Sequence, residues 1–262
     1  MLVEQTMQKL VSMKLQGMAE ALRRWLERPK EKDMSPLDLI GLLADAEWND
    51  REQKRLTARL RNARFRQDAS VEDIDYQHAR GLAKSVMLDL AACRWVTAHQ
   101  NVIFTGLTGV GKSYLACALG QKACRDGYTV VYRRASRLLD EVAQARADGT
   151  HFLLLRRLAK TDVLILDDFG LEVLNAAQRK DLLEVLEDRY GTSSTIVTSQ
   201  LEPKEWHSVI GDETIADAVC DRLVHNAHRV KLGGESIRKV KGDLTKAQKT
   251  AKQTYPAASR PG

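Results

Sequence analysis

Apolar residues recur at helical spacing in the first quarter of the chain. One apolar face predicts a helix over 4–28. Ser35 and Pro36 then provide an N-cap and a first helical position for a second helix, which extends to about residue 65. Two helices bury too little surface to form a large core, so residues 1–66 are predicted to be a small all-helical domain.

The next segment, 67–98, is predicted to be a polar linker followed by a leading helix over 82–97. From residue 99 to 240, short apolar runs alternate with helical patterns. Continuous apolar strands separated by helices are typical of a parallel sheet covered on both faces, so we expect an α/β fold with three α/β/α layers. The strands are predicted at 101–106, 128–133, 162–167, 194–199 and 228–232. The helices between them are predicted at 112–126, 136–149, 151–160, 175–190 and 203–226.

Composition narrows the class of protein. The chain has 262 residues, a net charge of +6 and four cysteines without CxxC spacing. It lacks an apolar signal core and any run long enough for a membrane span, so we expect a cytoplasmic protein with no membrane partner. The segment 241–262 is basic and poor in apolar residues, and we expect it to be disordered.

The sequence GLTGVGKS lies between a predicted strand and a predicted helix, and it matches the P-loop, or Walker A, pattern. Its glycines let successive backbone N–H groups point into one concavity, and the helix N-terminus adds positive potential. Lys112 is expected to reach the β- and γ-phosphates of ATP, and the Ser113 hydroxyl to bind Mg²⁺. The predicted nucleotide-binding residues are Gly106, Leu107, Thr108, Gly109, Val110, Gly111, Lys112, Ser113 and Tyr114.

Two adjacent acids end the predicted strand LILDD. Because Mg²⁺ beside a phosphate loop needs a carboxylate from a neighbouring strand, we expect Asp167 on the metal and Asp168 on the attacking water. A polar sensor is expected at the end of the strand TIVTSQ, where Ser199 is preferred over Thr198 and Gln200.

An arginine would complete the catalytic set. Arg222 is the candidate for action across a subunit interface, with Arg189 as the weaker alternative. Arg238 follows the last predicted strand and is expected to reach the γ-phosphate within the chain. The predicted catalytic residues are therefore Lys112, Asp168, Ser199, Arg222 and Arg238.

The ordered set GLTGVGKS, LILDDFG, DRYGTSSTIVTSQ, EPKEWHSVIGD, DRLVHNAHRVKL and GESIRK resembles the IstB-like helper ATPases of bacterial insertion sequences. These are relatives of the DnaC helicase loader and the DnaA initiator within the AAA+ superfamily. The resemblance covers nearly the whole chain. It implies ATP binding and hydrolysis, homo-oligomers on duplex DNA, assistance to a cognate transposase, and no full helical lid.

One position departs from the pattern of that family: many relatives have Glu where this chain has Asp168. The shorter side chain predicts slow hydrolysis, because a misplacement of about 1 Å can cost on the order of 10²-fold in rate.

Basic residues indicate where DNA binds. The segment 51–66 contains one acid, Glu52, among many cations, and the resemblance implies a DNA-facing helix near 150–160. The predicted DNA-binding residues are Arg51, Lys54, Arg55, Arg59, Arg61, Arg64 and Arg66, with Arg156, Arg157 and Lys160. A solvated helix face is the plainer interpretation of the first group. For the whole protein, a helicase loader and a DNA-binding scaffold without hydrolysis remain alternatives.

Overall fold

The computed structural model describes residues 2–27 and 34–237. The chain forms two compact units, Met1–Arg61 and Asn62–Gly262. The tail 241–262, the candidate Arg238 and the region where a lid would follow lie outside the described residues. Among the residues described, no helix is long and apolar enough to cross a membrane.

The described residues of the first unit form three helices: α1 (Leu2–Ser12), α2 (Gln16–Glu27) and α3 (Pro36–Ala63), the last of which extends past the unit's end at Arg61. The predicted single helix over 4–28 is wrong, because Lys14 takes a left-handed φ of 60° and ends α1. The predicted cap of α3 is confirmed: the Ser35 hydroxyl accepts a hydrogen bond from the Asp38 N–H at 3.2 Å. Buried Glu47 on α3 accepts a hydrogen bond from the Met18 N–H of α2 at 3.2 Å, which ties these helices together.

The segment between α3 and the first strand is not a simple polar linker. Ala69, Ile74 and Arg80 are buried in it, so much of 67–80 packs as part of the second unit. The predicted single helix over 82–97 is also wrong. It is two helices, α4 (Lys84–Ala91) and α5 (Arg94–Thr97), which are separated where Cys93 takes a φ of 55°.

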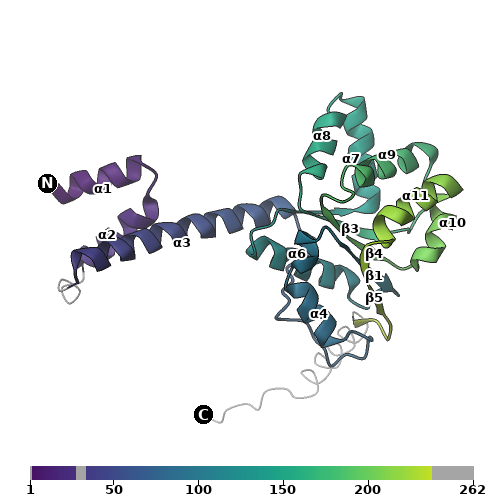
Figure 1. Ribbon diagram of the computed structural model, residues 1–262, viewed down its shortest axis with the longest axis horizontal. Helices are drawn as coiled ribbons and strands as arrows, with labels where there is room; N and C mark the ends of the chain where they lie inside the picture. Colours follow the sequence, from purple (N-terminus) through teal and green to yellow (C-terminus); the bar gives the residue numbers. More distant parts are fainter. Residues whose placement is uncertain (1, 28–33, 238–262) are drawn as a thin grey trace, which may run out of the picture. The chain divides into compact units, whose positions relative to one another are not determined.

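Five parallel strands form the sheet of the second unit, in the order β2-β3-β4-β1-β5 (Figure 1). All five predicted strands are confirmed, and their observed ends differ from the predicted ends by at most two residues. They are β1 (Asn101–Gly106), β2 (Val130–Arg134), β3 (Val163–Phe169), β4 (Ser194–Ser199) and β5 (Ala227–Leu232).

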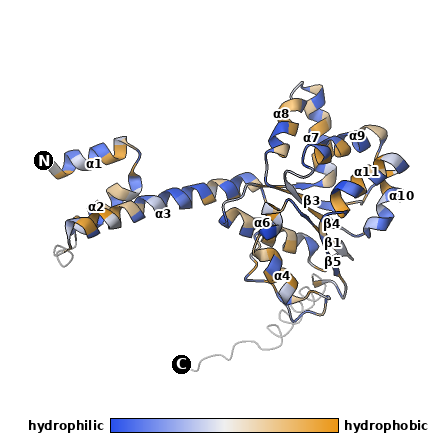
Figure 2. Cartoon of the chain, viewed as in Figure 1, coloured by the Kyte–Doolittle hydropathy of each residue, from blue (hydrophilic) through white to orange (hydrophobic). Residues whose placement is uncertain are grey.

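Helices cover both faces of the sheet, which confirms the predicted three layers. On one face lies α6 (Lys112–Arg125), and α4 lies beside it. On the other lie α7 (Ala135–Ala147), α9 (Ala176–Glu187) and α11 (Glu213–Val224), with α8 (His151–Ala159), the short 3₁₀ helix η2 (Pro203–Glu205) and α10 (Trp206–Ile210). These helices alternate between hydrophobic and hydrophilic residues (Figure 2), as expected when one side of each is buried. The predicted capping box of α9 is present, with Asn175 and Gln178 bonded reciprocally.

Candidate nucleotide-binding site

The phosphate loop connects β1 to α6. Gly106 has a φ of 140°, and a Cβ there would lie 2.1 Å from the Leu232 carbonyl oxygen of β5, so no side chain fits. Gly111 takes a φ of 98° and serves as the N-cap of α6. The Lys112 ammonium donates to the carbonyl oxygens of Gly106 and Leu107, at 2.7 and 2.9 Å. The loop therefore holds its own lysine beside the helix N-terminus, where phosphate oxygens are favoured.

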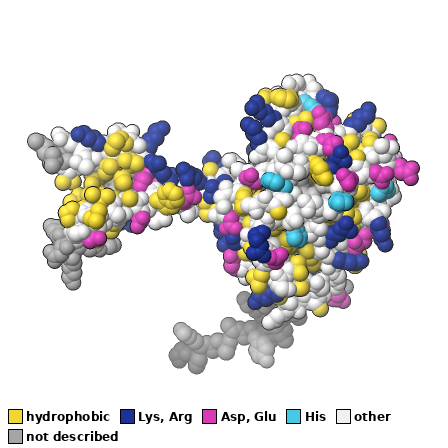
Figure 3. All heavy atoms as spheres, viewed as in Figure 1, with side chains coloured by type: hydrophobic (Ala, Val, Ile, Leu, Met, Phe, Trp, Pro, Cys, Tyr) yellow, Lys and Arg dark blue, Asp and Glu magenta, His cyan; other side chains and the backbone are white. Residues whose placement is uncertain are grey.

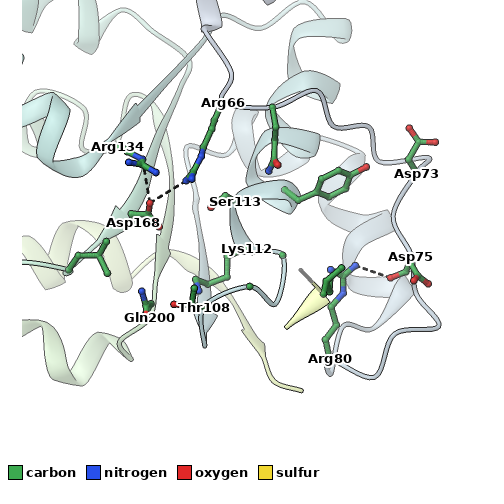
Figure 4. Close-up of a pocket in the computed structure, with 16 residues that line it drawn as sticks. Arg66, Asp73, Asp75, Arg80, Thr108, Lys112, Ser113, Arg134, Asp168 and Gln200 are labelled. Carbon is green, nitrogen blue, oxygen red and sulfur yellow. Dashed lines mark hydrogen bonds and ion pairs between the residues drawn. The ribbon is translucent and has the colours of Figure 1, made fainter. Parts of the chain in front are cut away.

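A cavity of about 480 Å³ opens over this loop (Figure 4). The loop contributes Thr108, Gly109, Gly111, Lys112, Ser113 and Tyr114 to its lining. Of the other predicted binding residues, Val110 is buried, and its carbonyl oxygen accepts a hydrogen bond from Arg80. The cavity also contacts Asp73 and Asp75 from the segment after α3 and Ile237 from the end of the described chain.

Asp167 ends the regular part of β3 and is fully buried. Its carboxylate accepts hydrogen bonds from three hydroxyl groups: those of Ser113 at 2.7 Å, Thr198 at 2.6 Å and Tyr132 at 2.6 Å. Burial raises the pKa of the Tyr132 hydroxyl, and its hydrogen bond to Asp167 raises it further, so the tyrosine stays a donor. The expected meeting of the Ser113 hydroxyl and the Asp167 carboxylate is present in the structure.

Asp168 points into the cavity because the strand is irregular there. A bulge interrupts the β3–β4 register between Leu166 and Phe169, and Asp168 has a φ of 59°. Aspartate tolerates this left-handed conformation better than longer side chains do. Its carboxylate lies 3.4 Å from Arg66 Nη1 and 3.5 Å from Arg134 Nε.

The three sensor candidates at the end of β4 have different environments. The hydroxyl of Ser199, the preferred candidate, donates to the Phe169 carbonyl oxygen at 2.7 Å and accepts from the Leu201 N–H. Ser199 is fully buried, so its assignment as the sensor is not supported. Thr198 donates to Asp167 and accepts from the Asp168 N–H, and it therefore orients both acids. Of the three, Gln200 lines the cavity.

The two arginine candidates for action between subunits differ in their burial and in their partners. Arg189 is 2% exposed, and its guanidinium donates to the carbonyl oxygens of Leu158, Thr161 and Ser194. Burial lowers its pKa to about 10. Arg189 is thus a structural residue and is wrong as a candidate for action between subunits. Arg222 on α11 is paired with Glu187 on α9 and does not line the cavity of its own chain.

Of the ten predicted DNA-binding residues, Arg61 and Arg64 are exposed and Arg59 is half-buried, and the other seven fall into three groups. Arg51, Lys54 and Arg55 on α3 are exposed, and each pairs with an acid one turn away on the same helix. Arg156, Arg157 and Lys160 at the end of α8 are exposed and form no ion pair with any described residue. Arg66 differs from both groups, because it contacts the acid pair inside the cavity. Its side chain therefore faces the acids in this structure, and DNA binding by Arg66 stays a prediction. We call the group Arg51, Lys54, Arg55, Arg59 and Arg61 the basic stripe.

The residues that were not predicted from the sequence include Arg134 and Arg80, which line the cavity, and Tyr132, which donates a hydrogen bond to Asp167. Arg134 ends β2 directly beside Asp167 in the sheet register, so its place at the end of a neighbouring strand was the available signal. Arg80 is 3% exposed and donates to the carbonyl oxygens of Asp75 and Val110, at 2.8 and 3.3 Å. Burial lowers its pKa. No periodic pattern marks Arg80, because it lies in an irregular segment.

The parallel sheet, the phosphate loop between β1 and α6 and the acids at the end of β3 define a P-loop nucleotide-binding protein. The model of the IstB-like ATP binding protein family matches residues 8–245, and the chain belongs to that family. It is an ATP-binding ATPase.

Two relatives illustrate the likeness in sequence. An insertion sequence ATP-binding protein of Sinorhizobium fredii, y4pL, is 49% identical over 239 residues, which cover 91% of this chain and 98% of that protein. The IS21 ATP-binding protein of Pseudomonas aeruginosa is 31% identical over 229 residues, which cover 87% of this chain and 86% of that one.

Solved structures agree on the fold. DnaI is similar with a TM-score of 0.55 and 21% identity, over 63% of this chain and 90% of that one. The DnaC helicase loader gives a TM-score of 0.53 and 19% identity, over 63% and 96%. At these identities, the likeness concerns the fold alone.

Proposed function

We propose that this ATPase binds duplex DNA as an ATP-dependent homo-oligomer and assists the transposase of its insertion sequence in capturing target DNA. The observation that carries the proposal is an intact ATP site in a chain whose relatives are named for insertion sequences. Exposed basic residues outside that site support the DNA part.

The end of α8 is the stronger DNA candidate. Arg156, Arg157 and Lys160 are exposed there, and Phe152 and Leu153 at the start of the same helix are 71% and 65% exposed. Figure 3 shows Lys and Arg side chains beside an apolar patch at the top of the ATPase unit, where Figure 1 places α8. The cations at the end of α8 form no ion pair with a described residue and are available to DNA phosphates. The first three cations of the basic stripe must instead give up an ion pair with an acid of α3 before they bind a phosphate.

Magnesium fits the site by the chemistry of its donors. The Ser113 hydroxyl and the Asp167 carboxylate lie 2.7 Å apart, and both are the hard oxygen ligands that Mg²⁺ prefers. Bound there, the ion would neutralise phosphate charge. Lys112 would hold the phosphates, and Asp168, which is 26% exposed in its side chain, would accept a proton from the attacking water.

Assembly would bring Arg222 to a neighbouring subunit's ATP. In the single chain, Arg222 stacks over the Tyr190 ring and pairs with Glu187, so it is held in place near the surface. An arginine that acts in this way raises hydrolysis by roughly 10³–10⁵-fold. We expect Arg222→Ala to retain ATP binding and lose hydrolysis. A variant that hydrolyses ATP normally within the assembly contradicts this role.

The partner is tested by capture. The tagged chain, with duplex DNA and ATP, is mixed separately with the transposase encoded beside it and with a replicative helicase. We expect the transposase to be retained, and ATP and DNA to be required. Retention of the helicase instead would establish the helicase-loader alternative, which the DnaC-like fold favours.

A further inference from the structure

Arg66 lies three residues beyond the end of α3 at Ala63, yet its side chain reaches the acids of β3. One guanidinium nitrogen, Nη1, lies 3.4 Å from an oxygen of Asp167 and 3.4 Å from an oxygen of Asp168. Figure 4 shows Arg66 and Arg134 approaching Asp168 above the phosphate loop. The Arg66 side chain is 33% exposed, so this contact is partly shielded from water.

The two acids at the end of β3 need a cation nearby to offset their negative charge. Two carboxylates at adjacent positions repel each other, and Asp167 has no exposed surface through which water could screen it. The hydroxyls of Ser113, Thr198 and Tyr132 donate hydrogen bonds to Asp167 but carry no charge. Arg66 lies close to both acids, whereas the ion pair of Arg134 is with Asp168.

We propose that Arg66 is a positioning residue that competes with Mg²⁺ for the charge of the Asp167–Asp168 pair. Two cations on one acid pair repel each other, so the magnesium–nucleotide complex weakens the hold of the acids on Arg66. The inference rests on the proposed magnesium site and goes beyond it, because it names Arg66 as the residue that lowers the affinity of that site for magnesium.

The position of Arg66 in the chain gives this competition a consequence. The ring of the preceding residue, Phe65, packs so closely on Gly120 of α6 that a Cβ there would lie 2.7 Å from it. Arg66 therefore projects from a segment anchored on the ATPase unit, directly after the helix that carries the basic stripe. By reciprocity, any ligand that draws Arg66 away from the acids would strengthen magnesium binding by the same factor.

The test compares nucleotide affinity with Mg²⁺ and with EDTA, using the full chain and fluorescent ATP and ADP at equilibrium. For each nucleotide, the measured quantity is the dissociation constant in EDTA divided by the dissociation constant in Mg²⁺. Arg66→Ala should raise this ratio roughly tenfold with both nucleotides. Arg66→Lys keeps the charge and should lie nearer the wild type. Arg137→Ala removes an arginine that is 77% exposed and pairs with Asp140 on α7, and it should leave the ratio unchanged.

A second measurement does not involve nucleotide. Without Arg66 the acids lose a counterion, so Mg²⁺ alone should raise the melting temperature of Arg66→Ala more than that of the wild type. A ratio that is unchanged or lower in Arg66→Ala overturns the inference, since it would make Arg66 a nucleotide ligand or a bystander. A ratio of one in both proteins refutes the magnesium site as well, which separates the two failures.

Discussion

Two regions of the molecule use charge in opposite ways. One is the edge of the sheet that carries Lys112 and the acids of β3, which we call the phosphate edge, and the other is the basic stripe on α3. At the edge, Asp167 is fully buried, Lys112 is 7% exposed, and both have several partners. On the stripe, Arg51 and Arg55 are more than half exposed in their side chains and pair with acids of the same helix. Charges interact more strongly when water is excluded, so a single substitution should matter far more at the edge.

Lys112→Ala should have the largest effect. It removes the cation that the loop holds between two carbonyl oxygens, and we expect ATP affinity to fall roughly 10²-fold or more, with loss of ATP-dependent assembly. Equilibrium binding and light scattering measure both effects. Lys122→Ala on the same helix, which removes the partner of Asp126, is the matched control and should bind ATP normally. Assembly that persists in Lys112→Ala would show that ATP is not the trigger.

Asp168 should affect the rate of hydrolysis more than the affinity for nucleotide. Asp168→Asn removes the proton acceptor, and single-turnover hydrolysis is expected to fall on the order of 10²–10⁴-fold. Asp168→Glu extends the carboxylate and should raise hydrolysis, by up to about 10²-fold if length limits the wild type. The φ of 59° opposes the longer residue, so a loss of stability of about 1 kcal/mol should accompany the gain. An Asn variant with the wild-type rate would exclude Asp168 from catalysis.

Tyr132→Phe tests how much one hydroxyl group at the phosphate edge contributes to the stability of the fold. The change leaves fully buried Asp167 without one of its donors, so the free energy of unfolding should fall by about 1–3 kcal/mol in urea denaturation. Tyr128→Phe is the control, because its hydroxyl has no hydrogen bond to a described residue. Equal stability of the two variants would mean that water or the remaining donors replace Tyr132.

The basic surfaces should show the smallest and most salt-dependent effects. Replacing Arg156 and Arg157 by Ala should reduce the slope of log K against log salt by about 0.9 for each lost phosphate contact. Replacing Arg51 and Arg55 should reduce it less, because Glu47 and Glu52 already engage them. Fluorescence titrations of a labelled duplex over a range of salt concentrations measure both. A larger change from the α3 variant would make the stripe the main DNA surface.

The same comparison explains what could be predicted from sequence. The phosphate loop and Asp167 depend on local spacing and on the ends of neighbouring parallel strands, so their meeting followed from the fold class. Arg66 was predicted to bind DNA because it follows a run of cations in the sequence, whereas its contact with the acids depends on how the segment after α3 packs on α6. Breaks at Lys14 and Cys93 were missed because left-handed residues leave no hydrophobic signature.

Ser199 shows that the sequence does not predict the orientation of individual side chains at the end of β4. Three adjacent polar residues end β4, and the bulge beside Asp168 decides which of them faces the acids, the backbone or the cavity. Pattern analysis places all three at the correct edge of the sheet. It does not distinguish their orientations, because these follow from an irregularity in the register.

The central claim is that ATP, held at the phosphate edge, drives assembly on DNA. Electron microscopy of the full chain with duplex DNA, with and without ATP, tests this most directly. The account predicts regular multi-subunit particles on DNA with ATP, and bare DNA or scattered single subunits without it. Identical particles in the two conditions would contradict the claim.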